Sequence, residues 1–199
     1  MGLLIGEQAF PSSILQSVRA TLPLLAHSQA TDPSAVFLAN IDDEILQIPV
    51  RLYYPRNELL AVASRQDDQG LIAACLGTRH ADGYVREACL RRLLPVQQPW
   101  AVPFILHLLG EYVRQIVQLI DLHFQHADLT MYLPYLRQNP TLLRDIERRA
   151  VSYWDAYHRH QCPQWSEYTA HRAFLALRAA SARAGQCLEA TTAPRLRRR

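Results

Sequence analysis

The sequence predicts a mainly α protein of stacked antiparallel helical hairpins, either a HEAT-like α-solenoid or a compact helical domain, with a small N-terminal β-hairpin. Three observations predict this class. Only 7 of the 199 residues are glycine, which argues against a turn-rich all-β fold. Apolar residues recur at helical spacing through most of the chain beyond residue 58. A short phrase also returns about every 30 residues, as Val85-Arg86-x-Ala88, Val113-Arg114-x-Ile116 and Leu143-Arg144-x-Ile146.

The first elements are a helix and a hairpin. Pro11-Ser12-Ser13 is typical of a helix start, and Pro23 is expected to kink or divide that helix. A hairpin is expected at about residues 34–54, with a polar turn at Asp42-Asp43-Glu44. Its second strand shows apolar residues at every other position: Leu46, Ile48, Val50, Leu52 and Tyr54. Pro49 cannot donate to a ladder, so this strand lies at an edge or is paired on one side there.

Helical pairs are expected at about residues 58–157. Asp68 and Asp82 are suited to cap two of the helices. A closing helix at about 166–184 is expected to end at Gly185. Residues 1–185 would then form a single domain, and 186–199 a disordered basic tail.

The phrase Asp82-x-x-Val85-Arg86, with Cys89 and Leu93 on the same helical face, resembles the second helix of short HEAT-type repeats. The resemblance covers about residues 68–157. It implies that Val85 and the small residue Cys89 pack between neighbouring hairpins, and that Arg86 bonds to a neighbouring Asp or to backbone. It also implies scaffolding and binding by shape, with no enzyme activity and no named partner. The pattern weakens later, where Asp121 occupies a position expected to be Leu.

Charge argues against a dedicated nucleic-acid binder. The basic residues are all arginine, which indicates the coding bias of a GC-rich, bacterial genome, and the formal net charge is +3. The last five residues include four arginines (Arg195, Arg197, Arg198 and Arg199), so the rest of the chain is close to neutral. The four cysteines are dispersed, and no signal peptide or membrane span is recognised. A cytoplasmic protein is therefore expected.

Histidines offer the main candidates for chemistry. His107 lies among apolar residues and has Glu111 four positions later, an arrangement that would suit a buried base, although a core or groove histidine is the stronger interpretation. The pair His123 and His126, and the cluster from His158 to Cys162, suggest metal ligands, but no second pair has zinc spacing. No metal site or cofactor is therefore predicted. No known catalytic motif is present.

The candidate binding residues surround the first repeat-like connection and the helix after it. Arginine and aromatic residues are enriched at binding hot spots, which favours a docking ridge here. The alternative is structural, with Tyr84 and Trp100 filling gaps and Arg86 bonding Asp82. The full candidate set is Arg79, His80, Tyr84, Arg86, Trp100, His107, Glu111 and Arg114.

The leading hypothesis is a non-catalytic bacterial adaptor or regulatory module that binds another, unidentified protein. The alternative is nucleic-acid binding through arginine-rich helix faces and the basic tail. An enzyme with a His-centred site is a third hypothesis. No membrane contact is expected, and the oligomeric state is open.

Overall fold

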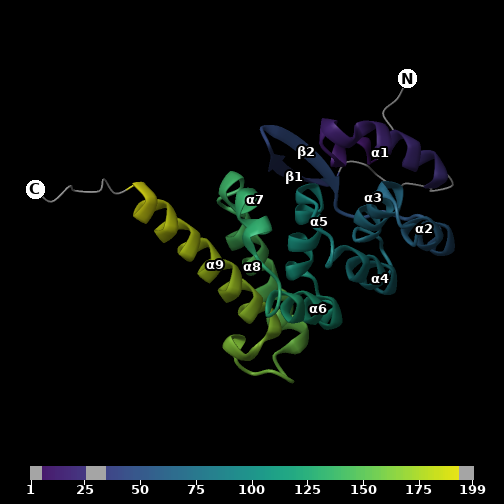
Figure 1. The fold of residues 1–199 in the computed structure, drawn as a ribbon. Helices are drawn as coiled ribbons and strands as arrows, with labels where there is room; N and C mark the ends of the chain where they lie inside the picture. Colours follow the sequence, from purple (N-terminus) through teal and green to yellow (C-terminus); the bar gives the residue numbers. More distant parts are fainter. Residues whose placement is uncertain (1–5, 26–34, 193–199) are drawn as a thin grey trace, which may run out of the picture.

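The computed structural model describes residues 6–25 and 35–192, and side chains up to residue 185. The fold is mainly helical with one two-stranded antiparallel sheet, so the coarse fold prediction is confirmed (Figure 1). The strands are β1 (Val36–Ile41) and β2 (Glu44–Pro49). The α-helices are α1 (Leu15–Thr21), α2 (Arg56–Ala63), α3 (Asp68–Gly77), α4 (Gly83–Leu93), α5 (Val102–Leu106), α6 (Arg114–Phe124), α7 (Leu133–Gln138), α8 (Leu142–Tyr153) and α9 (Thr169–Thr192). Short 3-10 turns include η1 (Glu7–Ala9), η3 (Leu22–Leu25), η5 (His107–Gly110) and η6 (Thr130–Tyr132).

The N-terminal segment forms one side of the core. The predicted division at Pro23 is observed, because α1 passes into the 3-10 turn η3 at that point. Phe10 stacks on Phe104 of α5, with ring centroids 5.2 Å apart. It also meets Trp100 edge-on at 5.9 Å. Phe10 therefore fixes its segment to elements that come much later in the sequence.

The hairpin is shorter than the alternation of apolar residues predicts. Asp42 and Asp43 both have positive φ (47° and 67°), the geometry of a two-residue turn that matches the strand twist. The ladder ends at Pro49, which pairs with Val36. Beyond it, Leu52 forms a parallel bridge with His80. Leu52 and Tyr54 are buried, as the alternation requires, but against the helical part of the chain.

The three helices that follow the hairpin pack tightly on one another. Asp67 caps α3 by accepting the Gly70 N–H at 2.9 Å, so the cap lies one residue before the predicted Asp68. Asp82 caps α4 by accepting the Tyr84 N–H at 2.8 Å, as predicted. The side chains of α3 from residue 70 to 77 are all buried, because α1, α2 and α4 surround it.

The closing helix is longer than predicted. Helix α9 continues through Gly185 to Thr192, because a glycine at an exposed helical position weakens a helix without ending it. Residues 186–192 of the predicted tail are therefore helical, and 193–199 lie outside the described residues. The ion pair between Asp121 and Arg172 fixes α9 to α6 at 2.5 Å, and Glu147 pairs with Arg178 to fix it to α8. Past these anchors, α9 projects away from the body (Figure 1).

None of the helices within residues 6–25 and 35–192 combines the length and the apolar character needed to cross a lipid bilayer.

Candidate functional site

Five of the eight predicted site residues come together between the hairpin, α4 and the turn after α5. They are Arg79, His80, Arg86, His107 and Glu111, and Arg51 and Arg149 join them. We use "arginine cluster" for Arg51, Arg79, Arg86 and Arg149 around Glu111.

The backbone beneath the arginine cluster is held by the bridge between Leu52 and His80. Leu52 donates its N–H to the Arg79 carbonyl at 2.9 Å and accepts the Ala81 N–H at 3.0 Å. His80 Nε2 donates to the Tyr54 carbonyl at 2.7 Å, and its Nδ1 accepts the Asp82 N–H at 2.9 Å. Both ring nitrogens of His80 are therefore used to fix the loop that leads into α4.

Glu111 is the carboxylate of the arginine cluster. Its oxygens lie 2.5 Å from Arg86 Nε and 3.1 Å from Arg51 Nη2. Glu111 does not contact His107, although their spacing left that pairing open, because the chain turns after η5 and the carboxylate pairs with Arg86 and Arg51 instead. Within the described residues, Glu111 is the only carboxylate in ion-pair contact with these four arginines.

Arg86 is fully buried and bonds to backbone. Its Nη1 donates to the His80 and Ala81 carbonyls at 2.8 and 2.7 Å. This agrees with the backbone bond that the HEAT resemblance implies, whereas the predicted bond to Asp82 is wrong because Asp82 accepts from Arg56. The arginines at the other two repeat positions differ, since Arg114 is half-buried and Arg144 is exposed. The three repeat positions therefore do not share one environment.

Arg79 and Arg149 lack a carboxylate partner. Arg79 Nη2 donates to the Val50 carbonyl at 3.2 Å, while its Nε and Nη1 are buried without an acceptor. Burial, with Arg51, Arg149 and Arg86 nearby, lowers the pKa of Arg79 to about 9. Arg149 donates to the Gly110 and His107 carbonyls at 3.0 and 2.9 Å. The arginine cluster therefore holds more positive charge than Glu111 can neutralise.

His107 lies against this charged region and faces a pocket. Its ring stacks on Phe37 with centroids 3.5 Å apart, and neither ring nitrogen has a hydrogen-bond partner. Only 7% of the residue is exposed. Burial, with Arg79 and Arg149 nearby, lowers the pKa of His107 well below its usual 6.5. The imidazole is neutral at pH 7 and offers one N–H donor and one acceptor.

The pocket beside His107, which we call the His107 pocket, has a volume of about 410 Å³. Two of its lining residues are joined by a pair of hydrogen bonds, which we call the clamp. The Asn139 side chain accepts the Asn40 N–H at 2.9 Å and donates to the Asn40 carbonyl at 2.8 Å. Its polar lining residues are Asn40, His107, Gln138, Asn139, Thr141, Asp145 and Arg149.

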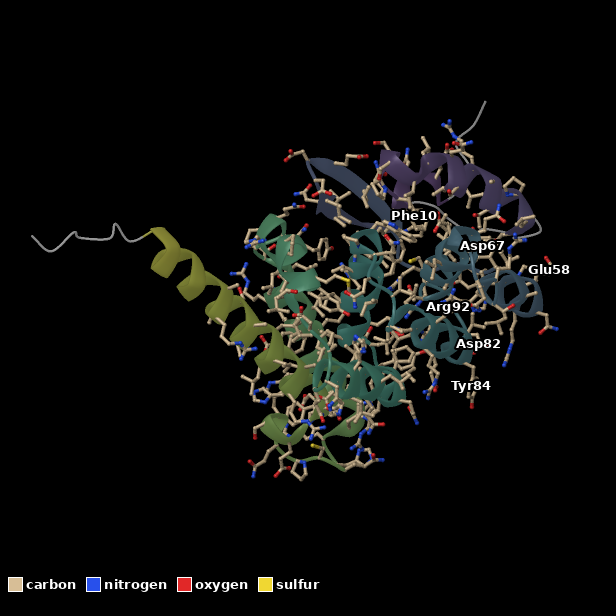
Figure 2. All side chains as sticks on the ribbon, viewed as in Figure 1. Phe10, Glu58, Asp67, Asp82, Tyr84 and Arg92 are labelled. Atoms are coloured by element: carbon tan, nitrogen blue, oxygen red, sulfur yellow. The ribbon has the colours of Figure 1, made fainter. Side chains whose placement is uncertain are left out.

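The other three predicted residues lie elsewhere. Tyr84 is exposed and projects from the start of α4 (Figure 2), with Arg56 5.9 Å above its ring. Trp100 is buried against Phe10. Arg114, the first residue of α6, donates to Gln161 at 3.4 Å. The structure therefore does not join these three residues to the arginine cluster.

The histidines and cysteines weighed as metal ligands have other surroundings. His158 Nε2 donates to the Tyr112 carbonyl at 2.9 Å, and its ring stacks on Tyr168. Across the described ranges, no group of three or more His, Cys, Asp or Glu side chains is placed to hold a metal ion. Cys75 and Cys89 are buried free thiols. Burial raises the pKa of Cys89 to about 12, which makes its thiol a poor nucleophile.

A second concave region, which we call the α9 groove, lies between α9 and the segment from the end of α6 to α7. It is open and apolar, with a volume of about 860 Å³. Arg137 and Arg183 line it, and neither has an ion-pair or hydrogen-bond partner among the described residues. Its other lining residues are Phe124, Gln125, Ala127, Asp128, Leu129, Thr130, Leu133, Ala176, Ala179, Ala180 and Ala184.

Sequence reasoning missed Arg51, Arg149 and the whole α9 groove. The alternating alanines and arginines of α9 were a usable signal for a helix with a small-residue face, but the opposing wall comes from residues about 50 positions earlier. Comparison with known proteins adds no relative, since no protein-family model, curated protein or solved structure matches this chain.

Proposed function

We propose that this protein is a non-catalytic binding module whose α9 groove receives an amphipathic helix of another protein. The observation that carries the proposal is the groove itself. It is an open apolar trough, walled by a helix that projects from the body and flanked by two unpaired arginines. Helix-in-groove binding uses this combination of an apolar floor and polar rims.

The size of the α9 groove suits a helix. An α-helix about 10 Å across and two turns long fills roughly 850 Å³, and the groove has a volume of about 860 Å³. The wall contributed by α9 is made of Ala176, Ala179, Ala180 and Ala184. Small side chains at this spacing let a second helix approach closely.

The charge of the α9 groove determines which kind of partner helix it would bind. Arg137 and Arg183 are exposed and have no ion-pair partner among the residues that the structure describes, whereas the carboxylate of Asp128 already accepts the Thr130 N–H at 2.9 Å and the Thr130 hydroxyl at 2.8 Å. The groove therefore presents positive charge to a ligand. The partner helix should carry an apolar stripe with Asp or Glu on both flanks, because complementary charges favour encounter and orientation.

Stacking of the helical pairs in the manner of HEAT-type repeats is part of this proposal. It is supported by the resemblance of residues 68–157 and by the packing of α3 on both α2 and α4. Scaffolds of this kind bind by shape. A cytoplasmic setting also belongs to the proposal, because dispersed free cysteines suit a reducing compartment.

The test uses the full chain and two synthetic helical peptides of 16 residues, both with leucine at positions i, i+3, i+4 and i+7. One peptide carries Glu on both flanks, and the other carries Lys at the same places. Fluorescence anisotropy should show the Glu peptide binding about tenfold more tightly, since each exposed ion pair contributes up to about 1 kcal/mol. The double variant Arg137→Glu/Arg183→Glu should reverse the preference.

The steric test places a large side chain in the α9 groove. Ala179→Trp should abolish binding of the Glu peptide. Gly185→Trp is the matched control, because a side chain added at Gly185 meets open space on the same helix. Equal binding of both peptides, or undiminished binding to Ala179→Trp, would refute the proposal.

Two further measurements test two other occupants of the α9 groove, a nucleic acid and a second copy of this chain. A labelled DNA duplex and a labelled single-stranded RNA should bind no more tightly to the wild-type chain than to Arg137→Glu/Arg183→Glu. Sedimentation should show the same mass for wild type and Ala179→Trp. If nucleic-acid binding requires the two arginines, the occupant of the α9 groove is a nucleic acid. If the wild-type chain is a dimer and Ala179→Trp is a monomer, the occupant is a second copy of this chain. Either result would overturn the proposed helix.

A further inference from the structure

Within the described residues, the arginine cluster has more positive charge than its one carboxylate offsets, and part of that charge is buried. Four guanidinium groups surround Glu111, and Arg86 is fully buried while Arg79 is 5% exposed. Three of their nitrogens on Arg51 and Arg79 are buried with no acceptor: Arg51 Nη1, Arg79 Nε and Arg79 Nη1. Buried charges in proteins are normally paired, so an excess of this kind favours the binding of an anion.

The His107 pocket opens onto one arginine of the arginine cluster, Arg149, while Arg51, Arg79 and Arg86 are not part of its lining. His107 and Arg149 both line the pocket, while Arg79 lies behind the ring of Phe37, with its guanidinium 5.5 Å from the ring centroid. His107 is more than nine-tenths buried, and its two ring nitrogens lack partners. The pocket therefore joins two donor groups to a layer of further positive charge.

We propose that the His107 pocket binds the phosphate group of a small phosphorylated metabolite or free phosphate. In this assignment His107 and Arg149 contact the phosphate directly. Arg51, Arg79 and Arg86 do not contact the phosphate. They attract it electrostatically through the protein interior, where a low dielectric strengthens the attraction. Arginine suits this role because its planar fork matches phosphate oxygens and it stays charged at neutral pH.

The chemistry favours phosphate over a single carboxylate. Three positive charges remain in the arginine cluster after Glu111 is counted, and a phosphate dianion offsets more of them than one carboxylate does. The amide and hydroxyl groups of Gln138, Asn139 and Thr141 supply neutral polar contacts for the rest of a ligand. Asp145 is the carboxylate in the lining; it accepts from Arg148 at 3.2 Å and suits a ligand hydroxyl. A pocket of about 410 Å³ fits a small polar metabolite.

This site is separate from the α9 groove, and its test does not depend on a partner protein. Thermal unfolding of the full chain is followed in inorganic phosphate and in chloride at equal ionic strength. At a phosphate concentration tenfold above Kd, the unfolding midpoint should rise by about 4 °C over chloride. His107→Phe keeps the ring stacking but removes the N–H, and should abolish this rise. Arg144→Ala, an exposed arginine on the same helix as Arg149, is the matched control and should keep it.

Arg149→Lys keeps the charge without the fork and tests the second direct contact. Phosphorus NMR titration should show the broadening or shift of the phosphate signal with wild type and Arg144→Ala. The same signal should change little with His107→Phe and Arg149→Lys. The NMR titration reports binding directly, so variants that are folded can be compared even if their unfolding temperatures differ.

Arg79→Met separates an anion site from a purely structural network. In chloride the variant should unfold at the same or a higher temperature than wild type, because a buried unpaired charge has been removed. In phosphate the order should reverse, since wild type gains more from the anion. A large loss of stability in chloride, with no phosphate response in wild type, would overturn the proposal.

The source of the phosphate group is decided by a ligand series. Inorganic phosphate, sugar monophosphates and malonate are compared by the same thermal shift. A sugar monophosphate that binds more tightly than inorganic phosphate identifies a metabolite site, and the reverse identifies a free-phosphate site. A larger response to malonate than to any phosphate would overturn the assignment to phosphate.

Discussion

The arginine cluster and the α9 groove use the same residue type in opposite ways. In the arginine cluster, Arg79 and Arg86 are buried, and carbonyls fix the directions of three guanidinium groups, those of Arg79, Arg86 and Arg149. In the α9 groove, Arg137 and Arg183 are exposed and unpaired. An arginine in the first region influences folding, whereas an arginine in the second is free to influence only binding. The same arginine-rich composition therefore supports two different physical roles.

The largest expected difference between the regions concerns the counterion. Glu111→Gln removes the carboxylate that contacts Arg86 and Arg51, and leaves the buried Arg86 and the half-buried Arg51 without an ion-pair partner. We expect a loss of about 3–5 kcal/mol in the free energy of unfolding, measured by urea denaturation.

Two controls sharpen this expectation. Glu87→Gln breaks only the exposed pair with Arg91, and Arg183→Ala removes a free charge from the α9 groove. Each should change the free energy of unfolding by less than about 0.5 kcal/mol. A cost for Glu111→Gln as small as these would mean that the arginine cluster is not held by its carboxylate.

The next effect compares packing density in the two regions. Gly77 ends α3, and a Cβ there would lie 2.2 Å from Cys89 Sγ and 3.3 Å from Leu59 Cδ2. Gly77→Ala should therefore cost about 2 kcal/mol, because the buried neighbours would have to move.

Gly185→Ala makes the same chemical change on α9, where the new Cβ meets open space. It should raise stability by about 0.5–1 kcal/mol, since alanine favours the helix. Opposite signs for the two variants in thermal unfolding are the expected result. A stabilising Gly77→Ala would show that α3 and α4 are less tightly packed than described.

The smallest effect is a pH dependence confined to the charged region. The folded pKa of His107 lies well below 6.5 because of burial and then Arg79 and Arg149, so the folded state resists protonation. The unfolded state takes up the proton below pH 6.5, and stability therefore falls as the pH falls. Between pH 7 and 5.5 the loss from this one group is about 1 kcal/mol.

His107→Phe should flatten this part of the stability–pH curve. An unaltered slope in His107→Phe would show that another group controls stability in this range.

Local sequence signals predicted the elements well and the contacts between them poorly. Asp82 was correctly expected to cap a helix, because capping involves residues two or three positions apart. The alternation from Leu46 onward correctly predicted that Leu46, Ile48, Leu52 and Tyr54 are buried. It was wrong for Val50, which is 37% exposed because the ladder ends at Pro49. A pairing of Glu111 with His107 was left open, since helical spacing was assumed across η5 where the chain instead turns. Arg51 and Arg149 could not be found, because they reach the cluster from positions 60 residues and about 40 residues away.

The α9 groove was also missed because its two walls come from segments that are distant in the sequence. One wall is a helix whose apolar face is made of alanines, which give a weak hydrophobic signal. The other wall is formed by side chains such as Leu129 and Leu133, which read as ordinary core residues. A concave surface is a property of two distant segments at a fixed separation, and no local pattern encodes that separation.

The clamp between Asn139 and Asn40 also protects an exposed strand. Leu38 and Ile45 lie on the outer face of the hairpin and are 62% and 66% exposed, a composition that invites sheet extension by other molecules. Asn139 satisfies both peptide groups of Asn40 on the unpaired side of β1, and Gln138 accepts the Asp42 N–H at 3.0 Å. One helix end thus imitates a neighbouring strand and discourages edge-to-edge aggregation at the tip of this small sheet.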